Sequence, residues 1–294
     1  MKLLKNDAGD VRLLWKVLLL VVGFFAVTYL LEEFFIWIAK YGVIRTGVMG
    51  SEATEQAHQF VSEFPPAGDL FAIAESLIWL LIGWVLVSKV EKQSFKSQLI
   101  GFEWKKNSIM MILIGIVIAT LFVVLSIVMN VVFWGGTFDL LKVQVSGTFG
   151  GILLTFVAAL VLAFTQELIF RSYLQDRMID KFGVGVGIML TSILFVVCNV
   201  IFRTMPAIEL LSGIFLYILI GYLYYRLRSL YLVGSIHTMI ILYPALFGIE
   251  APGEERFVIA ILLMMVGFYY FNEKDQKEKS AESIEGHHRA HPAH

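Results

Sequence analysis

The sequence predicts an all-α protein: a polytopic bundle of about eight transmembrane helices with both termini in the cytoplasm. Apolar residues make up 58% of the 294 positions and the mean hydropathy is +0.78, whereas soluble domains contain roughly 45–50% apolar residues. These residues are gathered into blocks of about 20, the length that a helix needs to cross about 30 Å of hydrocarbon. Blocks such as 112–128 lack the alternation of barrel strands, which argues against a transmembrane β-barrel.

Charged residues in the polar gaps predict the topology. If the N-terminus is cytoplasmic, 18 of the 23 Lys and Arg residues fall on inner segments. Because basic residues concentrate on the cytoplasmic side, this bias predicts an even number of spans. The first apolar block is too long for a signal peptide and is expected to be retained as a helix. The eight candidate spans are 14–39, 69–88, 108–134, 148–171, 184–202, 207–225, 230–248 and 256–271.

Outside the spans, two polar segments stand out. Residues 1–271 are predicted to form a single transmembrane domain, followed by a charged, His-containing tail at 272–294 that should be disordered in the cytoplasm. The outer segment 41–68 is polar enough to lie in water or along the membrane surface, either as a lid or docking element or as a passive connector. The net charge of −1 argues against a nucleic-acid partner, and the single cysteine, Cys198, is expected to serve packing.

Polar residues inside the spans are the candidates for function, because such residues are costly at membrane depth. The fourth span contains Gln166, Glu167 and Arg171. Glu167 and Arg171 are four residues apart, which places them on one helix face and predicts an ion pair. We expect Arg171 to lie near the inner boundary and to reach interfacial water. Asn199 lies in the fifth span, and His237 in the seventh is the only histidine within a span.

At these residues the chain resembles the CPBP family, also called the Abi family, of CAAX-type intramembrane proteases and bacteriocin-processing proteins. The family motifs are Glu-Glu-x-x-x-Arg followed by a small residue, Tyr and Leu; then Phe-x-x-x-His; then His-x-x-x-Asn or a similar polar residue. The resemblance covers roughly residues 95–248. The three motifs stand here as Gln166-Glu167-x-x-x-Arg171-Ser172-Tyr173-Leu174, Phe195-x-x-x-Asn199 and His237-x-x-x-Ile241.

Three positions depart from these motifs. The resemblance implies that the first glutamate activates the attacking water and that histidines assist, in a metal-dependent or glutamate-type mechanism. Gln166 has no carboxylate to accept the proton of that water, Asn199 is a poor metal ligand, and Ile241 offers no hydrogen bond. A zinc site needs about three ligands, but only Glu167 and His237 are obvious candidates. We therefore expect a degenerate site without a cofactor; a divalent metal such as zinc is implied only if the protein is active.

Three functional hypotheses remain open. The first is a non-catalytic protein of the plasma membrane of a prokaryote that binds a transmembrane helix of another membrane or cell-envelope protein. The resemblance supports it, since lysostaphin-resistance-like members of the family also lack the full motif and act as partners or regulators in the cell envelope. The second is an active endopeptidase that uses Glu167 and His237, although adjacent helical residues point about 100° apart. A small-solute transporter ranks last because the spans show no inverted repeat. The structural alternative is that Glu167 and Arg171 form an ion pair that fixes the fourth helix, with His237 and Asn199 hydrogen-bonded across the bundle.

Overall fold

The computed structural model describes residues 11–63, 65–95, 101–133, 135, 148–200, 206–247, 258–259, 261–263 and 265–267. The secondary-structure elements within these residues are all helices, which confirms the predicted all-α fold class. They are α1 (Leu13–Ile44), α2 (Gly50–Glu63), α3 (Pro65–Val85), the π-helix η1 (Leu86–Val90), α4 (Ser108–Phe133), α5 (Phe149–Glu167), the π-helix η4 (Leu168–Gln175), α6 (Asp176–Phe182), α7 (Val184–Val200), α8 (Ala207–Leu227) and α9 (Leu230–Phe247).

Seven apolar helical segments correspond to the first seven predicted spans. Five are long enough to cross a membrane, and two shorter apolar helices lie at Val184–Asn199 and Leu230–Leu246. Half of the eighth candidate, 256–271, lies outside the described residues, and the tail 272–294 lies wholly outside them. The span count and the side on which the termini lie stay predictions. The five long segments are Leu13–Ile44, Pro66–Val90, Ser108–Phe133, Phe149–Phe182 and Ala207–Leu227.

The structure corrects two boundaries. The helix of the fourth span does not end at residue 171, because α5 continues through η4 and α6 to Phe182. Polar side chains at and beyond this point, such as Arg171 and Arg177, hydrogen-bond to other residues of the protein. The helix can therefore continue past residue 171. The outer segment 41–68 contains the helix α2, which turns Ala53 and Ala57 inward. Small apolar residues four apart give this otherwise polar helix one face that can pack.

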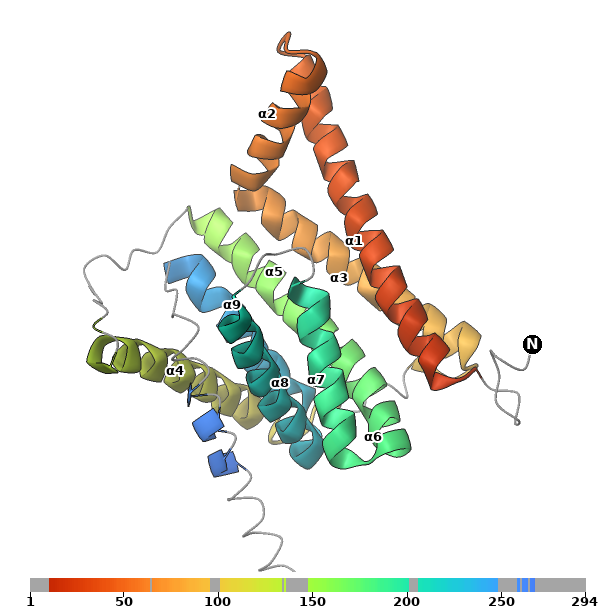
Figure 1. Ribbon diagram of the computed structural model, residues 1–294, viewed down its shortest axis with the longest axis vertical. Helices are drawn as coiled ribbons and strands as arrows, with labels where there is room; N and C mark the ends of the chain where they lie inside the picture. The colour runs from red at the N-terminus through yellow and green to blue at the C-terminus, as the bar shows by residue number, and fades with distance from the viewer. Residues whose placement is uncertain are drawn as a thin grey trace, which may run out of the picture.

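The helices form two connected parts. Helices α1, α2 and α3 trace a triangle, and α5 to α9 form a bundle beside it (Figure 1). Helix α5 joins the two parts because it packs on both α3 and α9. Helix α4 packs on α9, where Gly115 permits a close approach: a Cβ there would lie 2.6 Å from the carbonyl oxygen of Leu232. Close packing through small residues is typical of membrane helices.

The buried side chains form two main clusters on either side of α5 and η4. One cluster joins α1, α3, η4 and α7 around Trp79, Phe170 and Phe195, and it includes Cys198, in keeping with its predicted packing role. The other joins α4, α8 and α9 around Tyr224 and Leu232. Residues 166–175 pass between these clusters and are nearly all buried. The polar motif of the fourth span therefore lies inside the protein.

A polar cluster around Glu91 connects α1 to the bundle. The Glu91 carboxylate accepts hydrogen bonds from Lys16 at 2.7 Å, from Nε of Arg177 at 2.9 Å and from the Tyr173 hydroxyl at 3.1 Å. The guanidinium of Arg177 also lies 3.9 Å from the centre of the Tyr173 ring. Burial raises the pKa of Glu91, but the hydrogen bonds and charges of Arg177 and Lys16 outweigh it and hold the pKa below its usual value of 4.5.

We predict that Glu91→Gln destabilises the protein at neutral pH and has less effect in acid. A lowered carboxylate pKa stabilises the folded state above the unfolded pKa of about 4.5, and this stabilisation is lost as pH falls through the folded pKa. The loss at pH 7 should be roughly 1–3 kcal/mol, the value of hydrogen bonds to a charged group. Thermal unfolding in detergent at pH 7 and at a series of pH values below 4.5 measures it. Glu55→Gln, at an exposed position, is the matched control; a constant difference between Glu91→Gln and wild type at all pH values would contradict the assignment.

Candidate functional site

The candidate site begins where α5 passes into the π-helix η4. Gln166 and Glu167 are the last two residues of α5. The hydrogen bonds of a π-helix run from residue i to i+5, which widens the turn. Glu167, Arg171 and Gln175 follow one another at four-residue intervals, and all three side chains are 0% exposed. The local geometry thus presents one carboxylate, one guanidinium and one amide to the interior of the bundle.

The Glu167 carboxylate is the centre of this arrangement. Its Oε2 accepts a hydrogen bond from Nε of Arg171 at 3.1 Å, which confirms the predicted ion pair. Its Oε1 lies 3.0 Å from Nδ1 of His237. Since a carboxylate only accepts, Nδ1 must carry the proton, and Nε2 of a neutral ring then accepts from the Tyr217 hydroxyl at 3.0 Å. Both oxygens of Glu167 are therefore engaged.

Both terminal nitrogens of Arg171 donate to acceptors within the protein. One terminal nitrogen donates to the Tyr217 carbonyl at 3.0 Å, and the other to Gln175 Oε1 at 3.2 Å and Ser192 Oγ at 3.4 Å. Its guanidinium carbon also lies 5.7 Å from the centre of the Phe195 ring. The expectation that Arg171 reaches interfacial water is wrong, because these internal acceptors replace the water.

A glycine makes room for this network. Gln175 donates to the carbonyl of Gly221 in α8 at 2.9 Å. A Cβ at Gly221 would lie 2.7 Å from Gln175 Oε1 and 3.0 Å from an Arg171 terminal nitrogen. The backbone of α8 can approach the polar face of η4 only because position 221 has no side chain.

Gln166 and Asn199 form a separate, uncharged pair. Asn199 donates through Nδ2 to the Phe195 carbonyl at 2.9 Å, which leaves its Oδ1 to accept from Gln166 Nε2 at 3.2 Å. This chain of bonds fixes the orientation of both amides. It leaves Gln166 Oε1 buried without a hydrogen-bond partner, although the side chain of Asn199 itself is exposed. The pair therefore presents an unused acceptor.

The site brings together all five sequence-predicted residues in two halves. Glu167, Arg171 and His237 form a charged, buried half, and Gln166 and Asn199 a neutral half. The expected hydrogen bonds of His237 and Asn199 across the bundle are present. Ile241 stands apart, since it packs against the small apolar cluster of Ala159, Leu242 and Leu246.

The residues of the site do not fit a divalent metal. Among the described residues, no group of three or more His, Cys, Asp or Glu side chains is placed to hold a metal ion. Glu167 and His237 supply two such groups, but each already hydrogen-bonds the other, and the Arg171 cation contacts the same carboxylate. A catalytic zinc site needs about three protein ligands and a structural zinc site about four.

Sequence reasoning missed three residues of the network. Gln175 could have been found, because it stands four residues after Arg171 and extends the Glu167–Arg171 face. Tyr217 and Ser192 lie in apolar stretches of other helices. No spacing within one helix relates them to Glu167, so only the packing of α7 and α8 on η4 reveals them.

The fold and the site define a multi-pass helical membrane protein with a polar network buried between its helices. Residues 148–243 match the family described as type II CAAX prenyl endopeptidase Rce1-like. These residues include both halves of the site. Comparison with curated proteins and with solved structures gives no match. Residues 148–243 are therefore similar to Rce1-like, CAAX protease-like membrane proteins, in keeping with the motifs that the sequence shares with that group.

We predict that Arg171→Ala unfolds at a lower temperature than wild type. The substitution leaves the Glu167 carboxylate buried without its cation, and truncating one member of a buried pair costs about 3–5 kcal/mol. The double change Glu167→Gln with Arg171→Ala should recover part of the loss, because no charge is then left alone. Thermal melting in detergent measures both variants. Arg45→Ala removes an exposed arginine and serves as control; wild-type melting of the Arg171→Ala protein would refute the ion-pair argument.

Proposed function

We propose that the protein is a catalytically impaired, CAAX-protease-like protein that binds a transmembrane helix of another membrane or cell-envelope protein, in the plasma membrane of a prokaryote. The Gln166–Asn199 amide pair carries this proposal. The family resemblance assigns water activation to a carboxylate at position 166 and assistance to a histidine at position 199. Neither amide accepts or releases a proton near neutral pH, so general-base catalysis is lost at both positions.

The environment of Glu167 supports the same proposal. A replacement base would need a free carboxylate oxygen that faces the attacking water. Both Glu167 oxygens already accept hydrogen bonds, from Arg171 and from His237, and the side chain is 0% exposed.

The neutral half of the site has the chemistry to bind a helix. The exposed Asn199 amide can form hydrogen bonds with polar side chains of a second helix. Such interhelical bonds in a membrane contribute about 1–2 kcal/mol in model peptides. A partner helix that carries Ser, Thr, Asn or Gln at the depth of Asn199 would form such a bond.

One observation favours a second candidate function, an active endopeptidase that uses Glu167 and His237. The carboxylate and the imidazole lie 3.0 Å apart, the contact expected of an acid–base pair. Activity in this arrangement requires Glu167 to leave Arg171 and turn toward a bound peptide. The burial of both side chains makes this candidate the weaker one.

We predict that the purified protein in lipid does not cleave a panel of prenylated and leader-type peptides. Restoring both motif positions, by Gln166→Glu with Asn199→His, should produce measurable cleavage if the remaining geometry is intact; Gln166→Glu alone is the control. Peptide products are quantified by mass spectrometry. Cleavage by the wild type that disappears in Glu167→Gln would establish the endopeptidase and overturn the proposal.

We also predict that a photo-crosslinking residue at position 199 captures one membrane protein in stoichiometric amount in native membranes. The same residue at position 113, which is exposed on α4, controls for random collisions in the bilayer. Capture at 199 should occur through a transmembrane segment of the partner, identified by peptide mapping. Equal capture patterns at 199 and 113 would contradict a binding role for this face, whereas capture of a peptide with a newly formed end would favour proteolysis.

A further inference from the structure

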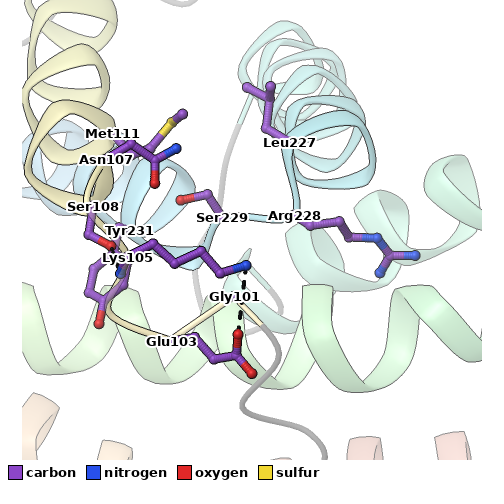
Figure 2. Close-up of a pocket in the computed structure, with 10 residues that line it drawn as sticks. All are labelled: Gly101, Glu103, Lys105, Asn107, Ser108, Met111, Leu227, Arg228, Ser229 and Tyr231. Carbon is purple, nitrogen blue, oxygen red and sulfur yellow. Dashed lines mark hydrogen bonds and ion pairs between the residues drawn. The ribbon is translucent and has the colours of Figure 1, made fainter.

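A second polar feature lies away from the buried network, where α4 begins and α8 joins α9. It is a cavity of about 110 Å³, here called the interfacial cavity, between the segment 101–107 and the helix junction 227–231 (Figure 2). Helix α4 begins at Ser108 and α8 ends at Leu227, and both are apolar enough to span the membrane. The ends of two spans place the cavity at the level of lipid headgroups.

The walls of the interfacial cavity are held in place by specific contacts. The N–H of Leu230 donates to the Gly101 carbonyl at 3.2 Å, and the Tyr231 hydroxyl donates to the Phe102 carbonyl at 2.8 Å. Trp104 packs edge-on against Tyr231, with ring centres 5.4 Å apart, yet its side chain is 65% exposed. An exposed tryptophan at the end of a span is typical of membrane interfaces.

Three charged residues line the cavity: Glu103, Lys105 and Arg228. Figure 2 shows the Lys105 amine reaching toward the Glu103 carboxylate, and the two groups are 3.6 Å apart. The Arg228 guanidinium points away from them and pairs with Asp176 at 2.6 Å. The Glu103 and Lys105 side chains are 72% and 65% exposed. A pair so exposed adds little stability, so a ligand can separate it at small cost.

Uncharged hydrogen-bonding groups complete the lining. Asn107 presents its amide at the start of α4 (Figure 2). Ser229 is buried, and its hydroxyl oxygen accepts the N–H of Leu232 at 3.4 Å, which leaves its O–H to donate. The cavity thus offers the Lys105 ammonium and two neutral donors to an anion, and the Glu103 carboxylate to a cation that carries N–H groups.

We propose that the interfacial cavity binds the headgroup of a zwitterionic phospholipid with a primary ammonium group. The phosphate accepts hydrogen bonds from Lys105, Asn107 and Ser229, and the ammonium donates to Glu103. Both contacts are charge-assisted. A headgroup with net negative charge meets repulsion from Glu103. A quaternary ammonium has no N–H group and therefore cannot donate a hydrogen bond to the Glu103 carboxylate. The lipid's acyl chains lie along the exposed apolar side chains of α4, such as Ile109 and Leu113.

Native mass spectrometry of the full-length protein in detergent tests this assignment. The protein is offered equal concentrations of phosphatidylethanolamine, phosphatidylcholine and phosphatidylglycerol with identical acyl chains. Phosphatidylethanolamine should be retained about tenfold better than the other two, the factor of one charge-assisted hydrogen bond. Glu103→Gln should reduce its retention to that of phosphatidylcholine, and Lys105→Gln should weaken all three. Lys106→Gln, a neighbouring exposed lysine that does not line the cavity, should bind like wild type.

Several results would overturn the proposal. Equal retention of the three lipids by wild type, or an unchanged preference in Glu103→Gln, removes the role of the paired charges. A stronger hold on phosphatidylglycerol identifies an anion site instead. Displacement of the lipid by an equal concentration of soluble glycerophosphoethanolamine shows that a free phosphodiester, not a membrane lipid, is the ligand. Both lining substitutions are at exposed positions, and unchanged melting temperatures without lipid verify that the variants are folded.

Discussion

A single buried carboxylate determines how the helices of the Rce1-like domain are arranged. An ionised Glu167 inside a membrane bundle is tolerable only if both oxygens are hydrogen-bonded and a cation is adjacent. Arg171 and His237 meet that requirement. Arg171 in turn needs acceptors, which α7 and α8 supply through Ser192 and the Tyr217 carbonyl. The positions of η4, α7, α8 and α9 therefore follow from the hydrogen bonds that one charge demands.

The sequence was sufficient to predict the structural features that depend on residues close together in the chain. Blocks of apolar residues indicated the helices, and the four-residue spacing of Glu167 and Arg171 indicated their ion pair. Features that depend on the packing of distant segments were not predictable. The complete burial of Arg171 requires acceptors from two other helices, and the continuation of the fourth span to Phe182 requires partners such as Glu91 for its polar residues. The helix α2 was missed because its buried face consists of small residues within a polar stretch.

The two halves of the site have different roles: the charged half stabilises the packing of the helices, and the neutral half occupies the positions at which the family motif places catalysis. The charged half connects the elements α5, η4, α7, α8 and α9. The loss of one of its members leaves a buried charge without its partner, which destabilises the fold. The neutral half is held by one amide–amide bond and one bond to a backbone carbonyl. Under the proposed function, this separation explains how a chain can depart from the family motif at positions 166 and 199 while it keeps Glu167, Arg171 and His237. The residues that hold the helices together are retained, and those that would activate water are changed.

The fixed orientation of the amide pair limits which side chains each of its two positions accepts. Because Asn199 Nδ2 is committed to the Phe195 carbonyl, position 166 faces an oxygen and must supply a donor. A glutamate at 166 would place two acceptors face to face, whereas a histidine at 199 can accept from Gln166 through a ring nitrogen. The two positions are therefore coupled: position 199 tolerates a replacement that keeps an acceptor, but position 166 loses its hydrogen bond when a carboxylate replaces its amide.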